Sequence, residues 1–223
     1  SGQSSCLDAD AGYYVDTTAA TSQTACAAGT YQASTGQSSC TYASAGYYVD
    51  TIASISQTAC AAGTYQASTG QSSCTDADAG YYTSSAGSTS QTACAVGTYQ
   101  PSTGQTSCDD ADVGYYVPST GSSSQNACTL GTYQPSTGQS SCIDASAGYY
   151  VYFTAATNQT ACAAGTYQPS TGQTSCNDAS AGYYVPNTGS PTQTACSLGT
   201  YQPSTGQSSC IDATTGYYVN STA

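Results

Sequence analysis

The sequence predicts a small disulfide-rich all-β repeat, arranged as an elongated rod or solenoid of short two-stranded hairpin modules with little or no helix. The cysteines from Cys6 to Cys210 alternate between a longer and a shorter spacing without exception, so a 34-residue unit recurs through the chain of 223 residues. The chain has few aliphatic residues but 22 tyrosines, and no apolar pattern follows the helical period. A repeat of this kind buries its apolar surface against its neighbours rather than in one central core.

The cysteine period also sets the expected repeat boundaries. We expect complete repeats flanked by partial ones, as a segment of a longer array, at residues 1–26, 27–60, 61–94, 95–128, 129–162, 163–196 and 197–223. No residue is inserted or deleted between successive cysteine periods. Flexibly linked modules tolerate insertions at a small entropic cost, so this constancy favours a regular rod in which each module has a fixed relation to the next.

Each repeat contains two similar halves. Residues 98–100 (TYQ) and 115–117 (YYV) favour strands, because aromatic and β-branched side chains suit a pleated surface. Each segment is followed by Pro-Ser-Thr-Gly, at 101–104 and 118–121, which favours a turn because proline presets φ and glycine tolerates the exit. We therefore expect each half to form a short hairpin module.

A glycine precedes every aromatic strand, from Gly12 to Gly216. A residue without a Cβ at a fixed place in each copy indicates a positive φ or a close approach of two backbone segments. The alternative is that recent duplication copied the glycine whatever its conformation. Other positions differ between copies, notably 16–22 and 152–157, which weakens that alternative.

The charge of the chain excludes several classes of partner. Twelve aspartates and no Lys, Arg or His give a formal net charge of −12. Binding to nucleic acid and attraction to anionic membranes both need positive charge, and no apolar run approaches the length of a spanning helix. We therefore expect an acidic, tyrosine-rich protein with no nucleic-acid partner and no membrane insertion.

The cysteine pattern indicates the compartment. No C-x-x-C pair and no histidine is present, which favours a disulfide framework over a zinc site. Disulfides persist in oxidising surroundings, so we expect an extracellular or cell-surface protein. The sequence does not begin with Met, which we interpret as a mature or partial chain.

Short motifs in every repeat resemble a known family. The segments C-A-A-G-T-Y, S-T-G-Q-S-S-C and A-G-Y-Y resemble the ephrin-receptor-like cysteine-rich repeat, which is similar to the cysteine-rich modules of tumour-necrosis-factor and growth-factor receptors. The resemblance covers the whole chain, repeat by repeat. It departs from the family pattern because each expected C-x-x-C pair has lost one cysteine.

The resemblance implies a disulfide pairing, since the family joins the Cys before Gly-Thr-Tyr to the Cys that ends Ser-Ser-Cys. On this chain the implied pairs are Cys26–Cys40, Cys60–Cys74, Cys94–Cys108, Cys128–Cys142, Cys162–Cys176 and Cys196–Cys210. Cys6 would then close a loop that opens before residue 1. The other pairing, which begins with Cys6–Cys26, stays open at this point and would leave Cys210 unpaired. Under the implied pairing, the Gly-Tyr-Tyr half has no bridge of its own, and we expect stacked tyrosines to hold it.

Few residues are candidates for catalysis or for binding a cofactor. The chain has no His, Lys or Glu, and a nucleophilic serine needs an activating base, so we expect no enzyme and no cofactor. Some repeats carry loop aspartates whose oxygen atoms could bind calcium weakly; the other interpretation is solvated loop charge. These residues are Asp8, Asp10, Asp76, Asp78, Asp109, Asp110 and Asp112.

Glycans are the expected covalent partners. Asn158 and Asn220 lie in Asn-x-Ser/Thr sequons, which are acceptors in secreted proteins. Hydroxyl residues beside Pro and Gly are compatible with O-linked sugar, and the alternative is that they only build turns. The candidate O-linked acceptors are Ser102, Thr103, Thr120, Ser136 and Thr137.

The nearly identical copies favour a structural function. We expect a non-catalytic subunit of an extracellular fibre, stalk or surface appendage, a filament whose partners are further copies of itself and its own neighbouring repeats. The alternative is a ligand-binding or adhesive receptor-like ectodomain, which needs a divergent repeat to form the contact surface. Tyr152 and Phe153 mark that repeat, since Phe153 is the single phenylalanine of the chain.

Overall fold

The computed structural model describes residues 6–219 and contains no helix within that range. Twenty-four two-residue strands form two-stranded antiparallel sheets there, each made of two strands adjacent in sequence. The chain divides into two compact units. The first comprises the residues up to Asp109 with Thr120–Ser124, and the second comprises Asp110–Ser119 and the residues from Gln125 onward.

Two kinds of hairpin alternate along the chain. The Gly-Thr-Tyr hairpins begin with β3 (Thr30–Tyr31), β7 (Thr64–Tyr65), β11 (Thr98–Tyr99), β15 (Thr132–Tyr133), β19 (Thr166–Tyr167) and β23 (Thr200–Tyr201). Their second strands are β4 (Thr41–Tyr42), β8 (Thr75–Asp76), β12 (Asp109–Asp110), β16 (Ile143–Asp144), β20 (Asn177–Asp178) and β24 (Ile211–Asp212).

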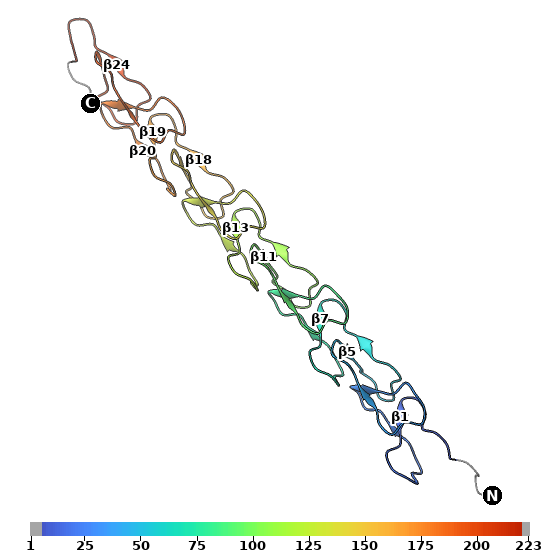
Figure 1. Ribbon diagram of the computed structural model, residues 1–223. Coiled ribbons are helices and arrows are strands. Elements are labelled where there is room, and N and C mark those ends of the chain that lie inside the picture. Colours follow the sequence, from blue (N-terminus) through green and yellow to red (C-terminus); the bar gives the residue numbers. More distant parts are fainter. Residues whose placement is uncertain (1–5, 220–223) are drawn as a thin grey trace. The chain divides into compact units, whose positions relative to one another are not determined.

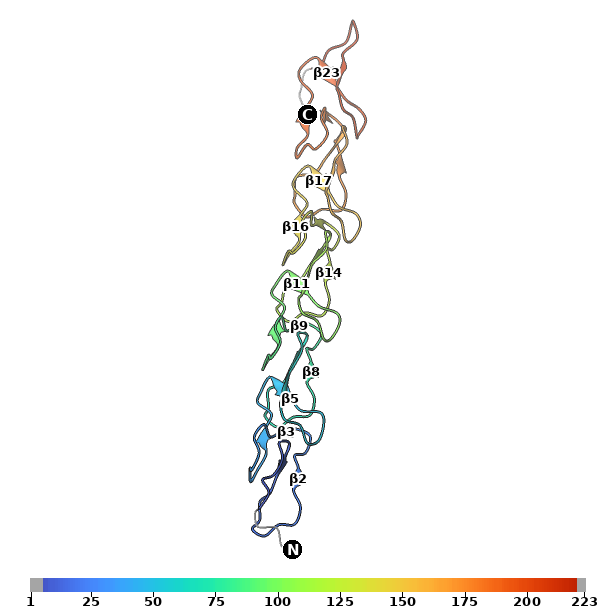
Figure 2. The same ribbon diagram turned by 90° about the vertical axis from the view of Figure 1, so that its right-hand side faces the viewer.

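The Gly-Tyr-Tyr hairpins have strands of the same length. They begin with β1 (Tyr13–Tyr14), β5 (Tyr47–Tyr48), β9 (Tyr81–Tyr82), β13 (Tyr115–Tyr116), β17 (Tyr149–Tyr150) and β21 (Tyr183–Tyr184). Their second strands are β2 (Thr24–Ala25), β6 (Thr58–Ala59), β10 (Thr92–Ala93), β14 (Asn126–Ala127), β18 (Thr160–Ala161) and β22 (Thr194–Ala195). Within each unit the hairpins follow one another in sequence order (Figures 1 and 2).

A tight turn leads into each first strand. The amide of Tyr13 donates to the carbonyl of Asp10 at 3.0 Å, and Gly12 between them has a φ of +84°. This is the third position of a turn that requires a positive φ, which glycine adopts without strain. The predicted role of the recurring glycine is therefore confirmed.

The smallest structural unit is half of the 34-residue sequence repeat, which we call a half-repeat. The amides of Cys26, Ala43 and Cys60 donate to the carbonyls of Gly12, Gly29 and Gly46 respectively, at 2.8–2.9 Å. Successive members of these two series are separated by half of the sequence period. Each half-repeat thus has the same backbone arrangement, although only every second one has its own cysteine pair.

The core is a series of small buried positions within each unit. Cys26, Ala43 and Cys60 are completely buried at the equivalent place in successive half-repeats. In the second unit, Ala145, Val151 and Ala156 form a cluster against which Tyr133 packs.

The structure confirms the all-β disulfide-rich repeat, but its strands are shorter than expected. Gln100 and Val117 were predicted to end strands and instead lie beyond them. Both side chains are buried, and the backbone there bonds to neighbouring half-repeats: the Gln100 amide donates to the Ser122 carbonyl, and the Val117 amide donates to the Gln139 carbonyl. The ladder within each hairpin therefore ends after two residues.

Candidate functional site

Within each compact unit, backbone hydrogen bonds join each half-repeat to the next. In the first unit, the amide of Gly29 donates to the carbonyl of Val49 at 2.7 Å, and the amide of Gln32 donates to that of Ser54 at 3.0 Å. In the opposite direction, the amide of Ala53 donates to the carbonyl of Cys26 at 2.8 Å. The same three bonds recur in other half-repeats of each unit. A short strand pair that could not be stable alone is thereby held by its neighbours.

The glycine before most first strands also contacts a loop two half-repeats away; Gly199, before β23, has nothing within 4 Å of its Cβ position. A Cβ on Gly12 would overlap the carbonyl oxygen of Ala53, and a Cβ on Gly63 would overlap that of Gly104. In the second unit, the same contact joins Gly131 to Gly172. Gly12, Gly63 and Gly131 therefore combine the two features that the sequence indicated as alternatives, a positive φ and a close backbone approach. Each such contact fixes the distance between repeats, because a backbone carbonyl cannot move aside as a flexible side chain could.

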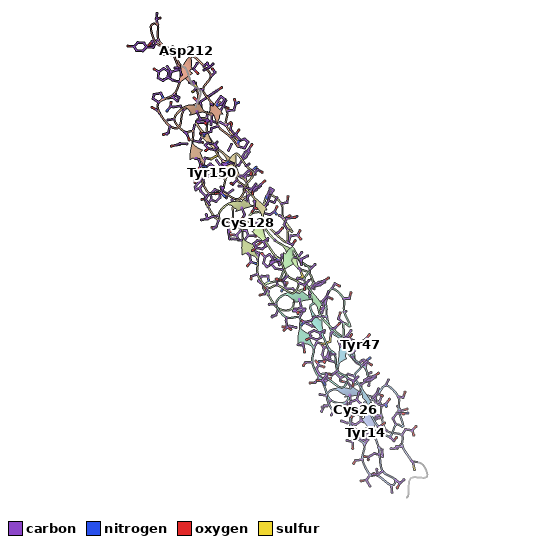
Figure 3. All side chains as sticks on the ribbon, turned by 60° about the vertical axis from the view of Figure 1, so that its left-hand side comes forward. Tyr14, Cys26, Tyr47, Cys128, Tyr150 and Asp212 are labelled. Carbon is purple, nitrogen blue, oxygen red and sulfur yellow. A yellow bond between two sulfur atoms is a disulfide. The ribbon has the colours of Figure 1, made fainter. Side chains whose placement is uncertain are left out.

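Disulfides close the Gly-Thr-Tyr loops in the pairing that the family resemblance implies. They join Cys26–Cys40, Cys60–Cys74, Cys94–Cys108, Cys128–Cys142, Cys162–Cys176 and Cys196–Cys210. The first cysteine of each pair is buried. Cys26 and Cys128, two of these residues, are labelled in Figure 3. Cys6 is exposed and unpaired in the part of the chain that the structure describes.

A glutamine takes the place of the disulfide in the Gly-Tyr-Tyr half. Gln57 and Ala43 lie one half-repeat after Cys40 and Cys26 respectively, so they occupy the positions of a bridged pair. The side-chain oxygen of Gln57 accepts a hydrogen bond from the amide of Ser44 at 2.6 Å, which closes the loop at the same point as the disulfide. The equivalent glutamines are Gln23, Gln57, Gln91, Gln125, Gln159 and Gln193.

This glutamine closure is a functional feature that the sequence reasoning missed. We expected stacked tyrosines to hold the Gly-Tyr-Tyr half, whereas a side-chain hydrogen bond closes its loop. Tyr47 instead directs its hydroxyl toward the Gly87 turn, 3.9 Å from the position of a Cβ there. The signal was present in the sequence, because a glutamine stands half a period after Cys40, Cys74, Cys108, Cys142 and Cys176, the second cysteines of five bridged loops.

A second glutamine stabilises the Gly-Thr-Tyr loop from inside. The side-chain nitrogen of Gln134 donates to the carbonyl of Ser141 at 2.8 Å, and its oxygen accepts from the amide of Ser136 at 3.1 Å. Gln134 is 4% exposed. Buried amides are stable only when both ends are bonded, and this side chain bonds to both arms of its loop. Val151 occupies the equivalent position in the following half-repeat.

The loop aspartates contact different partners and do not converge on one site. The carboxylate of Asp76 lies against the Gly104 turn, whereas Asp78 accepts a hydrogen bond from the Gln91 side chain at 2.7 Å. Asp10 accepts the equivalent bond from its own glutamine, also at 2.7 Å. Within residues 6–219, no group of three or more His, Cys, Asp or Glu side chains is placed to hold a metal ion. Calcium binding stays a prediction.

The candidate glycosylation residues within the described range are exposed. Asn158 is exposed, and its amide nitrogen donates to the Thr157 hydroxyl at 3.4 Å. Asn220 lies outside the described residues. The candidate O-linked acceptors are also exposed; they are Ser102, Thr103, Thr120, Ser136 and Thr137. Their glycosylation stays a prediction.

An aromatic cluster lies on the surface of the second unit. The ring centroids of Tyr150 and Tyr152 are 5.9 Å apart, and those of Tyr152 and Phe153 are 5.1 Å apart with the planes nearly perpendicular. Tyr152 is 62% exposed and Phe153 is 45% exposed. Tyr150, which is labelled in Figure 3, is half-buried beside Tyr152.

Two segments match the family model described as tyrosine-protein kinase ephrin type A/B receptor-like, at residues 46–94 and 114–162. The resemblance to the ephrin-receptor-like repeat is confirmed. Each match runs from the glycine of a Gly-Tyr-Tyr hairpin to the first cysteine of a later Gly-Thr-Tyr loop. No curated protein matches the chain.

The matched type of module agrees with the disulfide framework. Ephrin-receptor-like modules are disulfide-rich receptor-type modules rather than catalytic domains, and they are typical of extracellular regions. Over the residues that the structure describes, no helix has the length and apolar character needed to cross a membrane.

Proposed function

We propose that this chain is a non-catalytic structural segment of an extracellular fibre, stalk or surface appendage. The observation that carries the proposal is the interlock between half-repeats. A glycine contacts a backbone carbonyl two half-repeats away, as Gly63 contacts Gly104, while hydrogen bonds join adjacent half-repeats. A contact that spans three successive half-repeats restricts bending between them.

The interlock also explains the constant length of the repeats. An inserted residue between Cys60 and Gly63 would shift Gly63 away from the Thr83 carbonyl, to which its amide donates at 2.8 Å. A tether has no such requirement, because loop entropy changes slowly with length. Constancy of length is therefore a property that a stiff spacer needs and a flexible linker does not.

The proposal is tested by lengthening the chain. We would compare the full chain with a variant in which residues 61–128, two sequence periods, are duplicated. For a stiff segment, electron micrographs should show thin particles whose length increases in proportion to the number of repeats. Compact particles, or an end-to-end distance that grows only as the square root of repeat number, would contradict the proposal.

The second candidate function is that of an adhesive or ligand-binding ectodomain. Two observations favour it: the receptor-like family match and the exposed aromatic cluster of Tyr152 and Phe153. Exposed aromatic side chains are common anchors of binding sites. If this function holds, Tyr152→Ser with Phe153→Ser should abolish adhesion to a partner surface without changing particle length. Unchanged adhesion would remove its main support.

A further inference from the structure

The loop that carries the aromatic cluster is fixed at several points along its backbone. The amide of Val151 donates to the Gln173 carbonyl at 2.9 Å, and the amide of Ala155 donates to the Cys128 carbonyl at 2.9 Å. On the other arm, the side chain of Gln159 accepts a bond at 2.6 Å from the backbone amide of residue 146. The loop therefore presents its exposed side chains from a fixed backbone.

The exposed residues lie on two arms of one hairpin. Tyr150 and Thr160 are partners in the antiparallel pair of β17 and β18. Position 152 follows Tyr150 by two positions, and position 158 precedes Thr160 by two positions. Tyr152 and Asn158, both exposed, thus lie two residues beyond the same strand pair, on the two arms of one loop.

Both features are departures from the other copies, and both occur in the same loop. The residues equivalent to Tyr152 and Phe153 are polar, proline or small elsewhere: Asp16-Thr17, Asp50-Thr51, Ser84-Ser85, Pro118-Ser119 and Pro186-Asn187. The residue equivalent to Asn158 is a serine or threonine, which creates no sequon: Ser22, Ser56, Ser90, Ser124 and Thr192. The aromatic pair and the sequon Asn158-Gln159-Thr160 therefore coincide.

We propose that Asn158 carries an N-linked glycan whose first N-acetylglucosamine packs on the rings of Tyr152 and Phe153. The apolar C–H face of a pyranose complements an aromatic ring, and the covalent bond to Asn158 keeps the sugar next to the cluster. This packing covers two large aromatic side chains that are otherwise exposed to water. The inference rests on the proposed extracellular function, because N-glycosylation requires the secretory pathway.

The covalent step is a group transfer. A lipid-diphosphate-linked oligosaccharide, supplied by the host, is the donor. The side-chain nitrogen of Asn158 forms a bond to the anomeric carbon, while the bond from that carbon to the diphosphate oxygen breaks. The amide nitrogen loses one proton, and the lipid diphosphate leaves with the electron pair. The exposed Thr160 supplies the hydroxyl that the acceptor sequence requires.

The chain offers a matched control for the aromatic contribution. The substitution Ser90→Asn creates an Asn-Gln-Thr sequon at positions 90–92, in a loop whose exposed pair is Ser84-Ser85. The Gln91 side chain accepts from the Asp78 amide at 2.6 Å, as Gln159 does from the equivalent amide in its own loop. The two loops thus share their closure and differ in the residues beneath the sugar.

The experiment uses the full Ser90→Asn chain secreted from a eukaryotic host, with glycans trimmed to one N-acetylglucosamine per site. Peptide mass spectrometry gives the occupancy, and NMR gives the chemical shift of each N-acetyl methyl group. We expect Asn158 to be occupied and its methyl resonance to be shifted upfield of the one at the control sequon by the aromatic ring currents. Tyr152→Ser with Phe153→Ser should abolish the difference.

Two results would overturn the inference: an unoccupied Asn158, or equal methyl shifts at Asn158 and at the control sequon. Either result would leave Tyr152 and Phe153 free for the adhesive function. Neither result affects the structural proposal, since particle length is measured separately. Conversely, compact particles together with a shifted methyl resonance would refute the proposal of a stiff segment and support the proposed packing of the glycan.

Discussion

Replacing one interlocking glycine by alanine tests the basis of the proposed rigidity. Gly63 has a φ of +90°, and an added Cβ would overlap the Gly104 carbonyl oxygen and lie 3.0 Å from its carbon. Gly199 has the same place in its half-repeat and a φ of +83°, but nothing lies within 4 Å of its Cβ position. The two Gly→Ala variants therefore share the backbone strain and differ in the contact.

The structure gives the expected magnitudes. A left-handed conformation costs an alanine about 1–2 kcal/mol, which both variants incur. At Gly63 the Gly104 segment must also retreat by about 1 Å to regain van der Waals separation. That movement lengthens the bonds from Gly63 N to Thr83 O and from Gly104 N to Ala77 O, both 2.8 Å. Loss of one buried bond adds about 1–3 kcal/mol, so we expect about 2–5 kcal/mol for Gly63→Ala.

Hydrogen exchange is the suitable assay, because repeat arrays open locally and a single unfolding free energy is poorly defined for them. The Ala77 amide reports on Gly63, since it donates to the Gly63 carbonyl at 2.9 Å, and the Ala213 amide reports on Gly199 in the same way. At about 1.4 kcal/mol per tenfold change, we expect exchange to accelerate about 30-fold or more at Ala77. At Ala213 we expect an acceleration of about 5–30-fold on the same scale. Equal acceleration at the two amides would refute the interlock.

Three further changes test other parts of the structure. Ala53→Gly should slow exchange of the Gln32 amide, which donates to the Ser54 carbonyl, by about 2–5-fold, because Ala53 has a φ of +56° that glycine adopts without strain. No slowing relative to Ala45→Gly would contradict this. Ala43→Cys with Gln57→Cys should form an additional disulfide, which the non-reduced mass would show as a loss of two hydrogens. Two additional free thiols would show instead that the two kinds of half-repeat are not equivalent at these positions. Gln91→Ala should accelerate exchange of the Asp78 amide about 3–10-fold, because it removes the acceptor of that amide. Gln71→Ala is the control: the Gln71 side chain donates to the Thr69 carbonyl at 3.2 Å, so its loss should leave exchange of the Asp78 amide unchanged.

The sequence alone determined the repeat, the absence of helices from residues 6–219 and the special conformation of the recurring glycine. These follow from local chemistry. Cysteine spacing sets the period, Tyr and Thr favour extended backbone, and a turn with a positive φ selects glycine, as at Gly12. The family resemblance supplied the cysteine pairing, which spacing alone had left open between two alternatives.

The tertiary structure decided what each of these segments contacts. That Gly63 meets Gly104, and that Gln57 closes a loop as Cys40 does, depends on segments brought together from different parts of the sequence. A glutamine side chain is compatible with many environments, so its type does not reveal its partner. The physical reason is that these contacts are non-local: each stabilises the chain only after the segments that form it have been placed side by side.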